Sequence, residues 1–344
     1  MSQAKTIAKL DEVRALLKEL PGPDLEAATA AQARQAQLTK PAGSLGRLEE
    51  VAVWLATWQG KPQPSLERPR VAVFAANHGV AAQGVSAFPV EVTAQMMANY
   101  INGGAAVNQL AALVDADLRV YEMALDEPTA DFTQGPAMSD EDCARAFSYG
   151  MMAVEDGFDI MALGEMGIGN TTSGAALAAA LFGGTAEDWV GRGTGVDDAG
   201  LARKVKAVSA GLAINKAAMT DPFEVMRCVG GLELAAIAGA VLACRLARVP
   251  VLLDGFTCTA AAAVLYKADK RLLDHCIVSH NSVEPGHVRL LEAINQRPLM
   301  NLGMRLGEGS GAALALSLAK AAVACHNGMA TFAEAGVSGQ ETAG

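Results

Sequence analysis

The sequence predicts an α/β protein whose large domain is a doubly wound, mostly parallel sheet, with a smaller helical domain built from the chain ends. Two observations predict this class. From residue 69 onwards, short runs of β-branched and aliphatic residues alternate with alanine-rich stretches that precede each next run. Before residue 60, by contrast, the apolar residues recur only at helical spacing.

Helices are predicted first along the chain. Residues 8–17 and 25–38 keep apolar side chains at three- and four-residue spacing, and the PGPD segment between them offers Asp24 as the cap of the second helix. KPAGSLGRLEE restarts a helix after a turn, and residues 60–68 form a proline-bearing linker. The stretch 329–336 predicts a short closing helix.

Six apolar runs are predicted to be the strands of the large domain. They are residues 71–76, 118–123, 160–163, 249–253, 276–278 and 299–304. Their alternation with helices predicts a Rossmann-like sheet covered on both faces. We therefore expect residues 61–319 to form the large catalytic domain, and residues 1–60 with 320–344 to form the small helical domain.

The turns that follow these strands are the candidates for a ligand site. Ligands of doubly wound sheets bind outside the carboxyl ends of the strands. The turns read NHG at 77–79, GEMGIGNTT at 164–172, DGFT at 254–257, SHNS at 279–282 and RLGEGSG at 305–311. Five polar, glycine-bearing turns facing one crevice predict the site more strongly than any single motif does.

Composition limits the possible partners. The formal net charge is −10 and no basic block compensates for it, so neither nucleic acid nor an anionic membrane is an expected partner. The longest apolar runs, residues 234–244 and 257–266, are shorter than the ~18 residues that a membrane span needs. The six cysteines form no C-x-x-C pair, and the N-terminus does not read as a signal peptide. These features predict a soluble cytoplasmic protein with reduced thiols.

The segment GEMGIGNTTSGAAL follows a strand and opens a helix, so its backbone N–H groups are suited to hold an anion. It is not a Walker A loop, because no lysine precedes Thr171 and Thr172. It contains Gly167 and Gly169 in G-x-G spacing, but threonine at the sixth position departs from a dinucleotide fingerprint. A carboxylate beside a phosphate would repel it, so Glu165 is either a functional acid or a solvated turn residue.

A second glycine loop, residues 191–195, leads into a helix that carries Lys204. On spacing alone, this lysine is a candidate contact for a phosphate group. Asp197 and Asp198 are predicted to cap the helix. The strand, paired acids and T-G-rich loop with which type I phosphoribosyltransferases hold magnesium and pyrophosphate are missing from the sequence.

No metal or cofactor site is expected. The five histidines form no H-E-x-x-H motif and no cysteine cluster accompanies them. His78 and His280 follow candidate strands, and we interpret such histidines first as hydrogen-bonding structural residues.

Glu308 stands between two glycines at a strand-to-helix turn, and Met304 and Leu306 make its surroundings apolar. Burial in such a place raises the pKa of a carboxyl group and suits it to act as a general base near neutral pH. No serine elbow of a hydrolase is completed here, so a nucleophilic serine is not expected.

Together these turns resemble the family of nicotinate-nucleotide–dimethylbenzimidazole phosphoribosyltransferases, which make the lower-ligand nucleotide of cobalamin. The matching segments span nearly the whole chain. They are LTKPAGSLGRLE at 38–49, NHGVAAQGVSAFPVEVTAQM at 77–96, GEMGIGNTT at 164–172, GRGTGVDD at 191–198, DGFTCTAAA at 254–262, SHNSVEPGH at 279–287, LGMRLGEGSGAALAL at 302–316 and MATFAEAGVS at 329–338.

The resemblance implies a transfer of 5-phosphoribosyl from nicotinate mononucleotide to 5,6-dimethylbenzimidazole, with inversion at the anomeric carbon. The products would be α-ribazole 5′-phosphate and nicotinate. The reaction is chemically sensible without a metal, because the leaving pyridinium departs with a neutral ring nitrogen and no pyrophosphate charge has to be neutralised. A carboxylate near the ribose would stabilise its oxocarbenium character.

The resemblance also implies roles for particular residues. Glu308 would be the base that takes a proton from the attacking imidazole, and Glu165 would assist near the ribose. The acceptor base would contact Ser86, Phe88, Gln95, Met304 and Leu306. Phosphate and ribose would contact Gly167, Ile168, Gly169, Asn170, Thr171, Thr172, Gly193, Lys204, Asn281 and Ser282. A homodimer is implied too, with the small domain completing a site.

Departures from the commoner family forms concern the acceptor more than the chemistry. They lie at Phe88 in the SAFP segment, at Asn281 and in residues 118–126. Adenine or a phenolic compound therefore remains an alternative acceptor. A nucleotide-dependent oxidoreductase would need a G-x-G-x-x-G turn after the first strand, which NHGVAAQG does not provide. A non-catalytic nucleotide-binding regulator would not need both glutamates.

Overall fold

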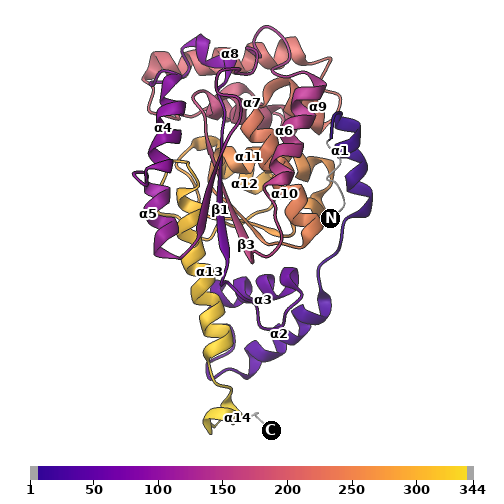
Figure 1. The fold of residues 1–344 in the computed structure, drawn as a ribbon, viewed down its shortest axis with the longest axis vertical. Coiled ribbons are helices and arrows are strands. Elements are labelled where there is room, and N and C mark those ends of the chain that lie inside the picture. Colours follow the sequence, from indigo (N-terminus) through magenta and orange to yellow (C-terminus); the bar gives the residue numbers. More distant parts are fainter. Residues whose placement is uncertain (1–6, 339–344) are drawn as a thin grey trace.

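Five parallel strands form one sheet in the order β2-β1-β3-β4-β5 (Figure 1). The computed structural model describes residues 7–338. The strands are β1 (Pro69–Ala75), β2 (Asp117–Glu122), β3 (Ile160–Met166), β4 (Val251–Leu253) and β5 (Cys276–Val278). Every neighbouring pair runs parallel. The order reverses between β1 and β3, which is the topological switch point where such sheets bind ligands.

The strands show why the sequence predicted a covered sheet. All of β1 and β4, and all but the last residue of β3, are buried, as expected for strands packed on both faces. The edge strand β2 alternates between exposed and half-buried residues. Continuous apolar runs therefore mark the centre of the sheet, and an alternating run marks its edge.

Helices cover both faces of this sheet. On one face lie α4, α5 and α13, and on the other lie α6, α7, α9, α10 and α11 (Figure 1). The helices of the large domain are α4 (Glu91–Ile101), α5 (Ala106–Leu113), α6 (Asp140–Met152), α7 (Asn170–Phe182), α8 (Asp198–Asn215), α9 (Pro222–Val229), α10 (Leu232–Ala247), α11 (Phe256–Ala268), α12 (Pro285–Ala293) and α13 (Ser310–Gly328). Short 3-10 helices occur at Leu17–Glu19, Gly79–Gln83, Ala186–Asp188 and Lys270–Leu273.

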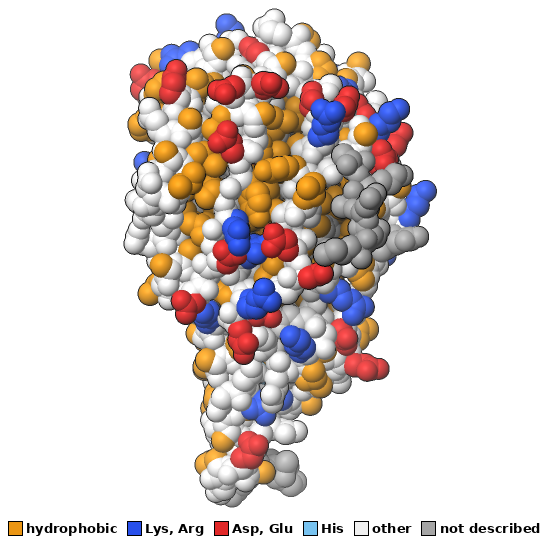
Figure 2. Space-filling model, viewed as in Figure 1, with side chains coloured by type: hydrophobic (Ala, Val, Ile, Leu, Met, Phe, Trp, Pro, Cys, Tyr) orange, Lys and Arg blue, Asp and Glu red, His pale blue; other side chains and the backbone are white. Residues whose placement is uncertain are grey.

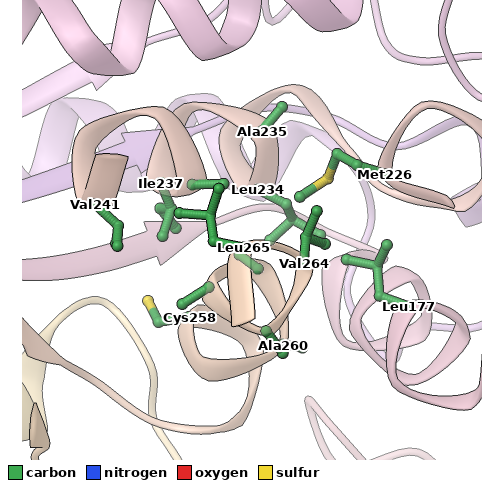
Figure 3. Packing of buried hydrophobic residues seen from close by; sticks show 14 of the residues in the cluster. Leu177, Met226, Leu234, Ala235, Ile237, Val241, Cys258, Ala260, Val264 and Leu265 are labelled. Atoms are coloured by element: carbon green, nitrogen blue, oxygen red, sulfur yellow. The ribbon is translucent and has the colours of Figure 1, made fainter. Parts of the chain in front are cut away.

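Small residues let these helices pack closely. A Cβ atom on Gly150 of α6 would lie 1.8 Å from the carbonyl oxygen of Ala236 in α10, and one on Gly239 would lie 2.0 Å from that of Phe147. Both glycines are therefore needed for this close approach. Behind α10, apolar side chains of α7, α9, α10 and α11 fill the core (Figure 3).

The helices below the sheet come from both chain ends. They are α2 (Leu25–Gln37), α3 (Arg47–Gln59), the end of α13 and α14 (Phe332–Ala335). The guanidinium group of Arg34 joins them by donating to three backbone carbonyls at the end of α13, among them that of His326 at 2.8 Å. A single antiparallel bridge pairs Leu38 with Thr331.

The first helix, α1 (Leu10–Leu16), lies instead beside the large domain and packs against α6. Its side chains Leu10 and Val13 are buried in the same core as the sheet helices. Arg14 pairs with Asp221 at 2.7 Å and with Glu224 at 3.0 Å.

Most predicted elements are found, with boundaries moved by a few residues. Asp24 caps α2 as predicted, accepting a hydrogen bond from the N–H of Ala27 at 2.9 Å. The strand predicted at 299–304 is wrong. Leu299 donates to the carbonyl of Val278, the last residue of β5, and Met300 donates to that of Ser279, but only Met300 forms a bridge, with His280. Pro298 has no N–H to donate and Gly303 takes a left-handed conformation, so the ladder cannot extend.

Candidate active site

A cleft of about 590 Å³ lies at the carboxyl ends of the strands. It is lined by residues from α4, β3 and the turns after β1, β3, β4, β5 and before α13. The lining residues are Phe88, Val92, Met96, Glu165, Met166, Gly167, Ile168, Asn170, Thr171, Gly193, Thr194, Gly255, Phe256, Thr257, His280, Ser282, Glu284, Arg305, Leu306, Gly307 and Glu308. A larger cavity, of about 720 Å³, lies between α6 and residues 122–139, and neither Glu165 nor Glu308 lines it.

Glu165 enters the cleft from the sheet itself. The prediction that a turn begins at residue 164 is wrong, because β3 continues to Met166 and holds Glu165 as its penultimate residue. The side chain is buried, which excludes the solvated turn acid. The amide Nδ2 of Asn170 donates to its carboxyl group. Regular pairing with β1 therefore fixes the backbone of Glu165, and Asn170 fixes its carboxyl group.

Glu308 is held in a left-handed backbone conformation. Its φ is 63°, between Gly307 at 80° and Gly309 at 79°. The backbone N–H of Glu308 donates to the carbonyl of Glu165 at 3.2 Å, which brings the two glutamates to the same wall. A Cβ atom on Gly307 would lie 2.7 Å from the carboxyl Oε1 of Glu165. Positive φ in a residue other than glycine is uncommon and tends to cluster at functional sites.

Asp254, directly after β4, anchors this turn to the sheet. Its carboxyl oxygens accept hydrogen bonds from the N–H of Gly309 at 3.2 Å and of Ala312 at 2.9 Å. The carboxylate thus caps the N-terminal end of α13, where negative charge is favourable. His280 Nε2 lies 3.6 Å from it. The turn DGFT at 254–257 was predicted to face the site, but no local sequence signal indicated that Asp254 would anchor the turn of Glu308.

The electrostatics of the cleft favour the neutral form of both glutamic acids. Burial, together with the nearby negative charge of Asp254, raises the pKa of Glu308 to about 7. Burial raises the pKa of Glu165 well above its ordinary value, and Asp254 and Glu233 add to the rise. A cationic ligand would favour ionisation of both groups.

A glycine loop and a buried lysine form the other side of the cleft. Lys204 is buried, and its Nζ donates to Thr171 Oγ1 at 2.8 Å. Burial lowers the pKa of Lys204 to about 8, against the opposing effect of Glu284. Gly193, with φ of 52°, covers the ammonium group, and its N–H donates to Glu284 Oε1 at 2.9 Å. Arg305 Nη1 donates to the carbonyl of Gly193 at 3.3 Å.

A buried hydrogen-bond network packs against the turn that contains Gly167 and Gly169. His78 Nε2 lies 2.6 Å from Glu233 Oε1, and its Nδ1 lies 3.0 Å from Ser173 Oγ. A Cβ atom on Gly167 would lie 3.3 Å from Glu233 and one on Gly169 would lie 3.2 Å from His78, so the network packs directly against the turn. All three side chains are buried, and His78 is confirmed as a hydrogen-bonding structural residue.

The structure brings many of the predicted site residues together in the cleft. Those that line it are Glu165, Glu308, Phe88, Leu306, Gly167, Ile168, Asn170, Thr171, Gly193 and Ser282. Those that do not line it are Ser86, Gln95, Met304, Gly169, Thr172, Lys204 and Asn281. Two of the latter contact the lining: Ser86 Oγ lies 3.1 Å from Thr194 Oγ1, and Lys204 Nζ donates to Thr171 Oγ1 at 2.8 Å. Gln95 is exposed on α4.

Several residues at or behind the cleft were missed from the sequence. Glu284, Arg305 and Thr194 lie within the motifs 279–287, 305–311 and 191–198, but nothing local distinguished them from their neighbours as site residues. Tyr100 and Glu233 lie within helices whose apolar pattern hides them. Only tertiary contact shows their relation to the glutamates.

Two searches of the described residues, 7–338, bear on other functions. No group of three or more histidine, cysteine, aspartate or glutamate side chains is arranged to hold a metal ion there. No helix in that span is long and apolar enough to cross a membrane.

Comparison with known proteins shows the family of the chain. A family model described as phosphoribosyltransferase matches residues 20–337. The chain belongs to this family. It is therefore a transferase, built on a parallel α/β sheet.

Individual relatives match over almost their full length. Proteins named nicotinate-nucleotide–dimethylbenzimidazole phosphoribosyltransferase from Sinorhizobium medicae and Methylocella silvestris are each 56% identical to this chain. The match to the Sinorhizobium medicae protein covers 95% of this chain and 97% of that protein. The match to the Methylocella silvestris protein covers 97% of this chain and 98% of that protein. The crystal structure of an enzyme of that name from Thermus thermophilus is 45% identical, with a TM-score of 0.86, over 92% of this chain and all of that one.

Proposed function

We propose that this chain transfers the 5-phosphoribosyl group of nicotinate mononucleotide to 5,6-dimethylbenzimidazole, giving α-ribazole 5′-phosphate and nicotinate for the nucleotide loop of cobalamin. One observation carries the proposal. Two buried glutamates share a wall of the cleft, opposite a glycine loop with a buried lysine. The names of the relatives agree with it.

The phosphate is assigned to the glycine side of the cleft. The helix α7 begins on this side at Asn170, and the N-terminal end of a helix carries partial positive charge that favours an anion. Thr171 and Gly193 line this side, and the ammonium of Lys204 behind them adds positive charge. Arg305 supplies a second cation at the same loop. This assignment keeps the phosphate away from the carboxyl groups of Glu165 and Glu308, which would repel it, while the carboxyl group of Glu284 on the phosphate side accepts a hydrogen bond from the N–H of Gly193.

The cationic part of the nucleotide is assigned to the glutamates. Burial raises the pKa values of Glu308 and Glu165, and the pyridinium of nicotinate mononucleotide favours their ionised form. As the bond from the anomeric carbon to the pyridinium nitrogen breaks, its electron pair returns to that nitrogen. The positive charge then moves to the ribose ring, where Glu165 stabilises it.

Glu308 acts as general base towards the acceptor. One imidazole nitrogen of the benzimidazole attacks the anomeric carbon, and the proton on the other nitrogen passes to the Glu308 carboxylate. The product then leaves as a neutral base. Phe88, Met96 and Leu306 provide apolar walls for a flat ring. Ser86, Gln95 and Met304 remain proposed contacts of the acceptor.

The assignment is tested by incubating the protein with nicotinate mononucleotide and a panel of acceptors in the presence of a chelator. We expect α-ribazole 5′-phosphate from dimethylbenzimidazole, with adenine and cresol as alternative acceptors. Chelation is expected to have no effect, because no step needs a metal. If none of the three acceptors yields a ribotide, the assignment is wrong.

The role of Glu308 is tested by Glu308→Gln. We expect kcat to fall by about 10²–10⁴-fold, the usual contribution of a general base, with the affinity for nicotinate mononucleotide retained. Glu292→Gln, at an exposed position on α12, is the matched control and should keep wild-type turnover. Unchanged turnover in the Glu308 variant would refute its role as base and favour a non-catalytic nucleotide-binding protein.

We further propose that the chain works as a homodimer in the cytoplasm. The resemblance to the family supports the dimer, with a small helical domain completing a site.

A further inference from the structure

Tyr100 lies near the end of α4, where the mechanism above gives it no role. Its side chain is 2% exposed and belongs to the apolar cluster formed by β1 and the first turns of α13. The same helix sends Val92 and Met96 into the cleft. Its hydroxyl is buried and has no well-aligned hydrogen-bond partner among the described residues. A buried hydroxyl without a partner is costly and is expected to have a function.

The hydroxyl faces the two glutamates. It lies close enough to the carboxyl group of Glu308 to favour the ionised form of that group. The negative charges of Glu308 and Glu165, together with burial, raise the pKa of Tyr100 far above its ordinary value. Tyr100 therefore keeps its proton at any working pH. It is available as a hydrogen-bond donor and not as a proton acceptor.

Among the described residues, few titratable groups besides Tyr100 interact with Glu308. They are Glu165 from β3 and Asp254 from the end of β4, with His280 at 3.6 Å from Asp254. The two acids disfavour a negative charge on Glu308. In this surrounding a neutral donor is the group that stabilises the ionised carboxylate.

We propose that Tyr100 is a positioning residue for Glu308: its hydroxyl donates a hydrogen bond to the ionised carboxylate and holds it in the orientation that accepts the proton of the acceptor base. This inference rests on the proposed role of Glu308 as general base. A partly protonated Glu308 needs this hydrogen bond less than the ionised carboxylate does. No proton is transferred to or from the tyrosine.

The test is the variant Tyr100→Phe, which removes only the hydroxyl. A hydrogen bond to a charged group is strong enough to move a pKa by about one unit. Since the bond favours the ionised carboxylate, its loss should raise the pKa of Glu308 from about 7 towards 8. The pKa of the acid limb in the pH profile of kcat/KM should rise by the same amount. At pH 7 the ionised fraction in the free enzyme, and with it kcat/KM, should then fall about fivefold and recover above pH 9, while the affinity for nicotinate mononucleotide should change little.

Tyr121→Phe is the matched control. Tyr121 stacks on Phe74, with ring centroids 4.9 Å apart, and does not line the cleft. We expect this variant to keep the wild-type pH profile. Both variants should melt within a few degrees of the wild type, because a hydroxyl without a partner adds little to stability.

A second measurement does not depend on turnover. The pKa of Glu308 is followed by the infrared carboxyl bands of protein labelled with ¹³C-glutamate, with Glu308→Gln identifying the band. A higher pKa in Tyr100→Phe than in the wild type supports the inference even if the assumed acceptor is wrong. An unchanged band and an unchanged acid limb would overturn it. A Tyr100→Phe protein that fails to fold would also overturn it, because the hydroxyl would then be a structural group.

Discussion

Glu308 combines two unfavourable features in one residue. Its φ of 63° lies in a region that side chains rarely occupy, at a cost of order 1–3 kcal/mol. Its carboxyl group is also buried next to Asp254, which raises its pKa to about 7. Neither feature improves the fold. Both place a carboxyl group that is half ionised near neutral pH against a cleft wall, which is what a general base requires.

The raised pKa predicts a stabilising effect of Glu308→Gln that depends on pH. The folded-state pKa of about 7 lies above the ordinary value of 4.5, so the folded protein binds the proton more tightly than the unfolded chain. The stabilisation from the protonated form is complete below about pH 4.5 and is lost as the pH rises through about 7. Glutamine does not ionise and keeps its contribution. We therefore expect the melting temperature of the variant, relative to that of the wild type, to be higher at pH 8 than at pH 5.

Scanning calorimetry at pH 5, 6, 7 and 8 measures this difference. Glu292→Gln should give a difference that does not change with pH, because its side chain is exposed. A constant difference for the Glu308 variant would mean that its carboxyl group titrates as it does in the unfolded chain.

At the level of elements, the site consists of turns fixed by strands and helix ends. β3 sets Glu165, the end of β4 sets Asp254, and Asp254 in turn fixes the start of α13 and the turn of Glu308. The glycine loop is held in the same way by Glu284 and Arg305. These anchors explain how a site of short turns keeps a defined geometry.

The sequence predicted the parts that carry a local signal. Glycine, acid and asparagine after an apolar run marked the turns of Glu165 and Glu308, and alanine-rich spacing marked most helices. The end of β3 was misplaced because glycine and glutamate at 164–165 are poor strand formers, whereas the neighbouring strand β1 pairs with both. Tyr100 could not be found at all. It occupies an apolar position of a regular helix, and only the tertiary structure, in which it joins an apolar cluster with residues of β1 and α13, relates it to the glutamates.

The glycine loop gives a prediction at this scale. In Gly193→Ala the new Cβ would lie 2.6 Å from Thr171 Oγ1 and 2.7 Å from Lys204 Nζ, on a backbone with positive φ. The loop must then move away from the lysine. We expect KM for nicotinate mononucleotide to rise about tenfold, the equivalent of ~1.4 kcal/mol, with a smaller change in kcat.

Gly183→Ala separates the effect of backbone strain from that of the close contacts at the loop. Gly183 also has positive φ, but no atom lies within 4 Å of the added Cβ. Both variants should lose about 1 kcal/mol of stability from backbone strain. Only Gly193→Ala should lose affinity. Equal KM values for the two variants would show that the loop does not contact the nucleotide.

For the whole molecule, the cleft and the small helical region lie at opposite ends. The helix α13 starts beside Glu308 and runs down to α14, so its 19 residues span about 28 Å between them (Figure 1). Hydrophobic side chains gather over the large domain in Figure 2, whereas charged ones alternate towards the small helical region. At the cleft, Phe88 is 52% and Leu306 56% exposed. The chain's own small helices cannot reach these side chains.

The distance of about 28 Å along α13 keeps the small helical region of a chain away from that chain's own cleft. A small helical region that completes the cleft must therefore come from a second chain, and the active species must then be a dimer. Sedimentation equilibrium should then give twice the 35.4 kDa of the chain at micromolar concentration. Specific activity should fall on dilution in step with dissociation, because a separated chain leaves Phe88 and Leu306 open to water and the benzimidazole poorly enclosed. Full activity from a species with the mass of a single chain would show that the cleft is complete in one chain.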